Sequence, residues 1–271
     1  MSFIRERSLQ ANGLQFYLGE AGEPDQPLVL MLHGFPECWA SWRFQLPVLA
    51  ESGYYAVAPD LRGYGGSEAP EGVANYSLRE LVADVVALIE ALGHDQALLV
   101  GHDFGAALGW QVARCHPERV RGYMALSVPY GGPAPEPPTE TMKRRFGNQF
   151  FYMLYFQQPE IPERELEADP ADSLRRVFHG LSAAADAAEV FAPREGGGFL
   201  DSMPRPEQQP HWMREVDLDY YVERFRRHGF TAPLNWYRAL DLHWRQTRND
   251  RDWQIRPPTA FVAGREDPVI A

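Results

Sequence analysis

Residues 97–115 read ALLVGHDFGAALGWQVARC, and at their centre stand Gly101-His102-Asp103-Phe104-Gly105. The apolar run at residues 97–100 is typical of a buried strand, residues 106–115 are typical of a helix, and the glycine-flanked segment between them indicates a tight turn. Strand, turn and helix follow without a spacer, so the side chain of Asp103 is expected to project from the edge of a sheet. The two glycines allow the strand and the helix to approach closely.

Other strand-like segments surround this unit. Apolar runs occupy residues 27–32 and 54–59 before it and residues 123–128 after it, and helix-like segments separate them. Alternation of this kind is typical of a parallel sheet covered by helices. We therefore expect an α/β fold in which Asp103 lies at the carboxyl edge of a central strand.

A helix is expected directly before the strand of this unit. Apolar residues recur at helical spacing over residues 78–92, and Gly93 follows them. Ser77 and Glu80 form the S-x-x-E pattern of a capping box. The pattern predicts a helix that begins after Ser77, ends before Gly93 and packs one face on the sheet.

The strand pattern stops in the Gly- and Pro-rich residues 131–138 and returns only at residues 258–263. Between them the chain is rich in Arg, Glu and aromatic residues, with a helical pattern at residues 213–227 and a Gly/Pro-rich loop at residues 192–210. We interpret this part as a helical insertion that covers the sheet as a lid. The expected division is a core of residues 1–132 and 241–271 with a helical cap of residues 133–240.

Composition excludes several classes of function. The 271 residues are 45% apolar, which is enough for one large domain or a domain with an insertion. The net charge of −11 disfavours binding to nucleic acid or to anionic membranes. The first ten residues are not expected to form a secretory signal or a membrane anchor, and two cysteines, Cys38 and Cys115, indicate neither a disulfide framework nor a zinc site. A reducing, cytoplasmic location is the resulting expectation.

The segment G-x-D-x-G between a strand and a helix is the setting of a nucleophile elbow. The alternative, that Asp103 only caps the following helix, explains neither the glycine pair nor the upstream His33-Gly34-Phe35-Pro36. A carboxylate is ionised near neutral pH and can attack a saturated carbon without a base. The resulting ester has a carbonyl carbon that water can attack, whereas an alkylated serine would be an inert ether. The substrate is therefore expected to carry an electrophilic sp3 carbon, as epoxides and haloalkanes do.

Two motifs together resemble the soluble epoxide hydrolase family of the α/β-hydrolase superfamily, namely His33-Gly34-Phe35-Pro36-Glu37 and Gly101-His102-Asp103-Phe104-Gly105. The resemblance covers essentially the whole chain, and it includes residues 60–67, to which we assign a structural role in a glycine-rich turn. It implies an α/β-hydrolase core, a mostly parallel sheet flanked by helices, with an inserted helical cap. The implied partners are a small-molecule epoxide and water in a monomer or homodimer, and no metal or cofactor is required.

The resemblance also implies roles for individual residues. Phe35 and Phe104 match the positions whose backbone N–H groups form the oxyanion hole. Tyr152 and Tyr237 match two cap tyrosines that hydrogen-bond the epoxide oxygen and help to protonate the opening alkoxide. The family usually has tryptophan after the nucleophile, so Phe104 removes an indole donor, which counts against halide binding.

Several polar residues keep more than one interpretation. Glu37 and His102 either order the attacking water and tune the site, as the resemblance implies, or have only structural roles. His33 is expected to fix its loop through hydrogen bonds to the backbone rather than to take protons from the substrate. Tyr155 and Tyr221 are interpreted as packing residues.

The triad order of the superfamily is nucleophile, acid, then histidine. Asp267, in Gly264-Arg265-Glu266-Asp267-Pro268, matches the acid, and Glu266 is the second choice. The last histidine of the chain is His243, which precedes Asp267, so the general base is missing from these residues. We expect that a C-terminal strand, a histidine loop and a closing helix are missing. The favoured explanation for the missing histidine is that these residues are a fragment of a longer enzyme. Two alternatives remain open: a partner chain or a lost segment supplies the histidine, or the protein is a degenerate relative of the family.

Two other functions fit parts of the pattern. A haloalkane or haloacid dehalogenase on the same fold would use the same aspartate, but it should have tryptophan or asparagine donors for the halide where this chain has Phe104 and the tyrosine pair. A non-catalytic protein that binds small molecules would keep the pocket and lack the histidine. Halide release would identify the first, and ligand binding without a covalent adduct the second.

Overall fold

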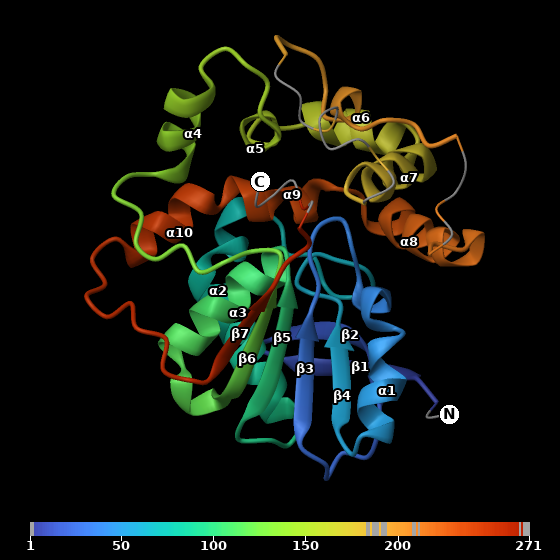
Figure 1. Cartoon of the computed structure of the whole chain (residues 1–271), viewed down its shortest axis with the longest axis vertical. Coiled ribbons are helices and arrows are strands. Elements are labelled where there is room, and N and C mark those ends of the chain that lie inside the picture. The colour runs from blue at the N-terminus through green and yellow to red at the C-terminus, as the bar shows by residue number, and fades with distance from the viewer. Residues whose placement is uncertain are drawn as a thin grey trace.

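The computed structural model describes residues 3–182, 185, 190, 194–207, 210, 212–265 and 267. In this part of the chain seven strands form one sheet in the order β1-β2-β4-β3-β5-β6-β7. Figure 1 shows this sheet with helices against it and a helical layer above one end of the strands. The strands are β1 (Arg5–Ala11), β2 (Leu14–Ala21), β3 (Leu28–Leu32), β4 (Tyr55–Pro59), β5 (Ala97–His102), β6 (Val120–Leu126) and β7 (Thr259–Val262).

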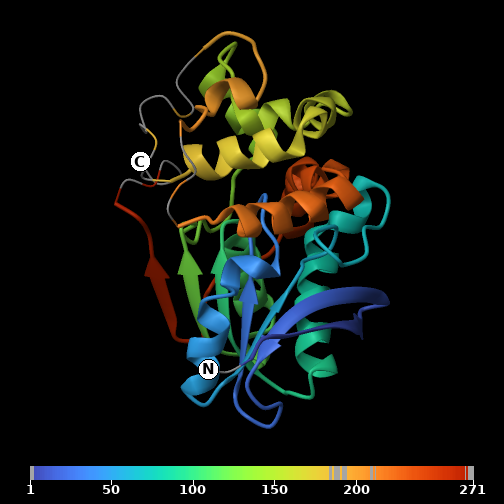
Figure 2. The same ribbon diagram turned by 90° about the vertical axis from the view of Figure 1, so that its right-hand side faces the viewer.

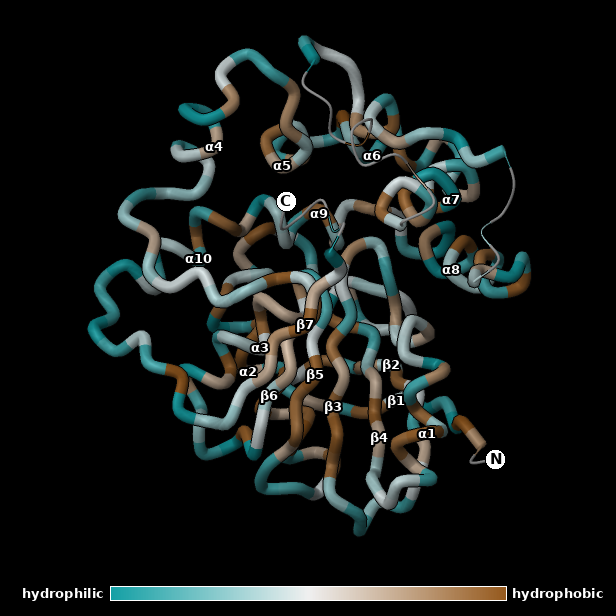
Figure 3. Tube along the Cα trace, in the orientation of Figure 1, coloured by the Kyte–Doolittle hydropathy of each residue, from teal (hydrophilic) through white to brown (hydrophobic). Residues whose placement is uncertain are grey.

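The pairing from β4 through β3, β5 and β6 to β7 is parallel, which confirms the predicted α/β fold. Every residue of β3 and β4 is buried, because a parallel sheet with both faces covered needs continuous apolar strands. Figure 3 shows apolar residues, in brown, along β3 and β5.

A β1–β2 hairpin, which the sequence analysis did not predict, extends the sheet in the antiparallel direction. Its turn is Asn12-Gly13, with φ angles of 47° and 74°. Positive φ at both central residues is the requirement of a type I′ turn, for which Asn-Gly is the strongest sequence signal. The strand β1 is mostly exposed and carries charged residues, so its apolar alternation is weak.

The remaining helices connect the strands and form the layer above the sheet (Figures 1 and 2). Against the sheet lie α1 (Gln45–Glu51), α2 (Leu78–Ala91) and α3 (Phe104–Cys115). After β6 the chain forms α4 (Pro138–Phe146), α5 (Tyr152–Tyr155), α6 (Ile161–Ala168), α7 (Pro170–Gly180), α8 (Glu215–His228), α9 (Thr231–Arg238) and α10 (Leu240–Thr247). Short 3-10 helices are η1 (Trp39–Trp42), η2 (Val73–Tyr76), η3 (Pro117–Arg119) and η4 (Leu200–Ser202).

The helix predicted at residues 213–227 is α8, and the predicted loop at residues 192–210 contains η4. Residues 192, 193, 208 and 209 of that loop lie outside the described residues. We keep residues 133–240 as the proposed cap, whose last residue, Leu240, is the first residue of α10.

The predicted capping box of α2 is wrong, whereas its predicted end is confirmed. Ser77 stands at the N-cap but its side chain makes no capping hydrogen bond. The Glu80 carboxylate instead lies 3.5 Å from Nη2 of the buried Arg62. At the other end Gly93 has φ 86°, and its N–H and that of His94 donate to carbonyls of the last turn, as in a Schellman motif.

The predicted turn at residues 101–105 is shorter in the structure, because β5 continues through His102 and α3 begins at Phe104. Asp103 alone reverses the chain, with φ 52° and ψ −119°. The need for glycine is confirmed. A Cβ on Gly101 would lie 2.3 Å from the Gly105 carbonyl oxygen, and one on Gly105 would lie 2.2 Å from the Leu32 carbonyl oxygen.

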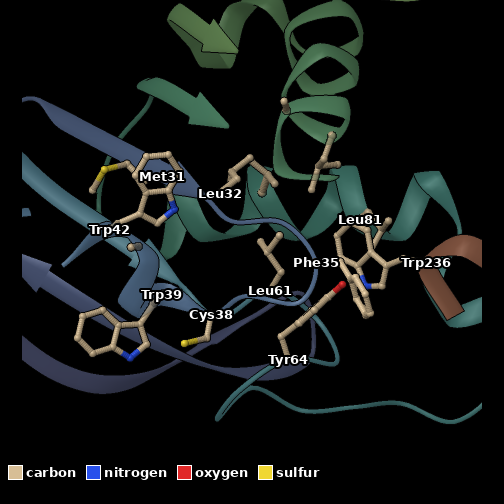
Figure 4. Close-up of a cluster of buried hydrophobic side chains, with 14 of the residues drawn as sticks. Met31, Leu32, Phe35, Cys38, Trp39, Trp42, Leu61, Tyr64, Leu81 and Trp236 are labelled. Atoms are coloured by element: carbon tan, nitrogen blue, oxygen red, sulfur yellow. The ribbon is translucent and has the colours of Figure 1, made fainter. Parts of the chain in front are cut away.

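Polar contacts fix the helical layer to the sheet domain. The Trp39 indole N–H donates to the Tyr220 hydroxyl of α8 at 2.7 Å, and the Trp236 indole N–H of α9 donates to the Arg62 carbonyl oxygen at 3.1 Å. The Tyr64 and Trp236 rings, whose centroids are 5.9 Å apart, belong to the buried cluster in Figure 4. Within the described residues, no helix combines the length and the apolar character needed to cross a bilayer.

Candidate active site

Asp103 occupies the tip of the turn between β5 and α3, at a φ that non-glycine residues seldom adopt. The Phe35 backbone N–H donates to its Oδ1 at 2.9 Å, and the Phe104 backbone N–H, next to it in the chain, lowers the pKa of its carboxylate. The Asp103 side chain makes no N-cap hydrogen bond to α3, so the capping alternative has no support. The two N–H groups named from the sequence thus both act on one carboxylate.

The loop that carries Phe35 follows β3, which pairs directly with β5. The buried His33 holds this loop: its Nδ1–H donates to the Gly34 carbonyl oxygen and its Nε2 accepts from the Leu61 N–H, both at 2.9 Å. Burial lowers the pKa of His33 to about 4, so its ring is neutral. The prediction that His33 fixes the loop is confirmed. A Cβ on Gly34 would lie 2.4 Å from the Asp103 Cβ, so only glycine permits this approach.

Glu37 and His102 form an ion pair beside the nucleophile, with 3.1 Å between the Glu37 Oε1 and the His102 Nδ1. The Glu37 charge raises the pKa of His102 to about 9. Although burial raises it, the His102 charge lowers the pKa of Glu37 to about 2. Burial raises the pKa of Asp103, and the charge of His102 offsets part of that rise. His102 therefore helps to keep Asp103 ionised.

Replacement of Glu37 by Gln is expected to lower the pKa of His102 from about 9 by at least one unit, because the Glu37 charge is the largest cause of the rise. The folded pKa lies above the unfolded value of about 6.5. The stabilisation from His102 is therefore fully present below about pH 6.5 and is lost as pH rises through about 9. NMR titration of the His102 ring measures the pKa directly.

Glu118 provides the matched control, because its Oε1 lies 3.1 Å from the Nδ1 of His116 in an exposed pair. Glu118→Gln should leave the His102 titration where it is. An unchanged His102 pKa in Glu37→Gln would contradict the assignment of Glu37 as its main partner.

Tyr152 of α5 and Tyr237 of α9 meet near the nucleophile, with ring centroids 5.9 Å apart. The Tyr237 ring also lies 5.3 Å from the Phe35 ring and 4.6 Å from the Phe104 ring. Burial raises the pKa of both tyrosines, and the charge of Asp103 adds to the rise. Both phenols are therefore protonated at neutral pH and can donate hydrogen bonds near Asp103.

Asp267 lies close enough to the site for its charge to contribute to the raised pKa of His102. Glu266 and residues 268–271 lie outside the described residues. His243 is on α10, where its Nε2 lies 2.8 Å from the Tyr76 carbonyl oxygen. Among the residues left as packing, Tyr221 is buried and its hydroxyl lies 2.9 Å from the Ser41 Oγ.

Two aromatic residues beside the site were not singled out in the sequence. The Trp236 ring centroid lies 5.4 Å from that of Phe104, and Tyr64 packs on His33 with 4.8 Å between ring centroids. Trp236 could have been suspected from its position next to Tyr237, but nothing local indicates that it touches the elbow.

Comparisons with known proteins identify a family and several relatives of this chain. Residues 27–271 match the family described as the alpha/beta hydrolase fold. The chain is 44% identical over 268 residues to epoxide hydrolase A of Mycobacterium tuberculosis (strain ATCC 25618 / H37Rv), covering 98% of this chain and 83% of the relative. It is 37% identical over 269 residues to epoxide hydrolase 3 of Siraitia grosvenorii, with coverage of 98% and 82%. The crystal structure of epoxide hydrolase A from Mycobacterium thermoresistibile superposes with a TM-score of 0.93 at 43% identity, covering 99% and 84% of the two chains.

Proposed function

Because this chain belongs to the epoxide hydrolase family of the α/β-hydrolase superfamily, we propose that it opens epoxides by attack of Asp103 on a ring carbon. The observation that carries the proposal is the carboxylate of Asp103 itself, which accepts the Phe35 backbone N–H and lies near two protonated phenols. A haloalkane would need donors for a departing halide, whereas phenols are suited to protonating an alkoxide.

In the first step a carboxylate oxygen of Asp103 forms a bond to one ring carbon, and the bond between that carbon and the epoxide oxygen breaks. The electron pair of the broken bond stays on the epoxide oxygen. Tyr152 and Tyr237 hydrogen-bond that oxygen, and one of them transfers its proton to it. The product of the step is a hydroxyalkyl ester of Asp103, and the phenol regains its proton from solvent.

In the second step water attacks the ester carbonyl carbon and loses one proton to a base. The bond between that carbon and the alkyl oxygen then breaks, the leaving oxygen takes up the other proton of water and departs as a vicinal diol, and the Asp103 carboxylate is regenerated. The N–H groups of Phe35 and Phe104 stabilise the oxyanion that forms on the carbonyl oxygen, each by about 3 kcal/mol. We propose Asp267 as the acid of the relay that supports the base for this water, and the Glu37–His102 pair as the group that tunes the charge around the ester.

Replacement of either Tyr152 or Tyr237 by Phe is expected to lower the rate of ester formation about 100-fold, and replacement of both at least about 1,000-fold, because the leaving alkoxide loses its proton donors. Intact mass spectrometry of reactions quenched at successive times measures these rates of ester formation. Tyr155→Phe is the control, since Tyr155 lies in the same short helix α5 and should change the rate less than about threefold. Full activity in both single variants would remove the tyrosines from the mechanism.

The proposal is tested by exposing the protein to styrene oxide, followed by intact mass spectrometry and peptide mapping. The expected result is a mass increase equal to that of the epoxide, located on Asp103, or release of phenylethanediol. Chloride release from a 1-chloroalkane without any reaction with the epoxide would favour a dehalogenase. Binding of styrene oxide with neither adduct nor diol would favour a non-catalytic binding protein.

A further inference from the structure

A cavity of about 230 Å³ borders Phe104 but not Asp103, between α2, α3 and α10. Its walls are mainly apolar, including Leu78, Leu81, Leu108, Trp236, Leu240 and Trp244. An apolar cavity of roughly 150 Å³ is large enough to bind benzene. This cavity therefore has room for a larger apolar group, and none of the residues assigned to the mechanism except Phe104 contributes to its walls.

The polar groups on the cavity wall already have partners within the protein. The Nε2 of His243 lies 2.8 Å from the Tyr76 carbonyl oxygen, and burial lowers the pKa of this histidine, so it is neutral. The Thr247 hydroxyl donates to the His243 carbonyl oxygen at 3.0 Å, and the Gln111 Oε1 accepts from the Arg114 Nε at 3.0 Å. An occupant gains little from these groups, which favours an apolar one.

The Phe104 ring contacts one residue near the nucleophile and one residue of the cavity wall. Its ring centroid lies 4.6 Å from the ring of Tyr237, which is near Asp103, and 5.4 Å from the ring of Trp236, which lines the cavity. Its backbone N–H lowers the pKa of the Asp103 carboxylate. Phe104 thus follows the nucleophile in the chain, and its side chain is part of the cavity wall.

We propose that the Phe104 side chain is the specificity-determining partition of this site, which closes the space above Asp103 off from the cavity. The group that the cavity accepts, once the partition is removed, is the alkyl chain of a terminal epoxide. This inference rests on the proposed function. With Phe104 in place, a longer alkyl chain on the epoxide is not buried in the cavity. With the Phe104 ring removed, each methylene of that alkyl chain that enters the cavity raises the rate of ester formation about fourfold.

The test compares the rates of ester formation with 1,2-epoxybutane and 1,2-epoxydecane, measured as adduct plus diol per protein. The ratio of the decane rate to the butane rate is expected to rise at least about tenfold in Phe104→Ala relative to the original chain. The backbone N–H of residue 104 is retained in this variant. Phe104→Leu, which keeps more of the packing, should raise the ratio in the same direction by a smaller factor.

Ala107 allows the cavity to be refilled. It is exposed and lines the cavity one helical turn from Phe104. The double variant Phe104→Ala/Ala107→Phe should return the ratio to its original value, and Val216→Phe, on the exposed surface of α8, adds the same bulk as a control.

The possible outcomes distinguish a failure of the proposed function from a failure of the proposed partition. Reaction of neither epoxide with Asp103 in the original chain overturns the proposed function and the partition with it. Reaction of both epoxides with an unchanged ratio in the Phe104 variants overturns the partition alone. So does a fall in the ratio in the single variant Ala107→Phe, because the alkyl chain would then already occupy the cavity.

Discussion

Replacement of Asp103 by Asn is expected to abolish reaction with epoxides, with a loss of at least about 10⁴-fold in the rate of ester formation. The amide has nearly the same size as the carboxylate but is neutral, so its oxygen is a far weaker nucleophile. Incubation with styrene oxide followed by intact mass spectrometry measures the loss. Asp219→Asn, which removes an exposed carboxylate on α8, is the control and should react like the original chain.

The same substitution is expected not to destabilise the fold. Burial raises the pKa of Asp103, which means that the folded environment disfavours its ionised form. At a pH above that raised pKa, a neutral amide removes an unfavourable charge, so the melting temperature should be equal or higher. An inactive variant with a markedly lower melting temperature would instead indicate damage to the elbow. Adduct formation at the original rate in Asp103→Asn would show that another residue is the nucleophile.

Local signals were sufficient for the unit from β5 to α3. The apolar run, the glycine pair and the helix pattern are adjacent in the sequence, and the structure places strand, turn and helix there. The limits of the turn were not predictable, because the ladder with β6 keeps residues through His102 in the strand. The β1–β2 hairpin was missed although Asn12-Gly13 is a local signal, because an exposed edge strand lacks the apolar alternation that marks a buried one.

The candidate site depends on contacts that no single segment contains. The approach of Phe35 to Asp103 follows from the pairing of β3 with β5, in which Leu32 lies opposite Gly101, and a parallel sheet made this expected. The meeting of Tyr152 with Tyr237 does not follow from any pattern, since α5 has only four residues and lies far from α9 in the sequence. Only the family resemblance indicated this pair.

The protonation states of the site residues were the property least predictable from the sequence. The sequence places Glu37 and His102 in two motifs and leaves their roles open, whereas the structure joins them at 3.1 Å. Whether His102 is protonated depends on burial and on the neighbouring carboxylates, which are set by tertiary structure. That state determines whether His102 can act as a base.

The ester on Asp103 is expected to persist in a polypeptide of these 271 residues. His33 is neutral, but both of its ring nitrogens are engaged with the backbone. His102 has a pKa of about 9 and is paired with Glu37, so at neutral pH it has no free electron pair for a proton of water. Epoxide consumption should therefore stop near one equivalent per protein, with ester hydrolysis at least about 100-fold slower than ester formation.

Time-resolved intact mass, with the diol measured by chromatography, separates the two steps. Added imidazole, a base that reaches the site from solvent, should accelerate loss of the ester, whereas added chloride at the same ionic strength should not. Glu37→Gln should also accelerate it near pH 8, because a lower pKa leaves the His102 ring partly neutral beside the ester. Many turnovers per protein at neutral pH without added base would contradict this account, and would mean that His102 or another group of the chain activates water despite its charge.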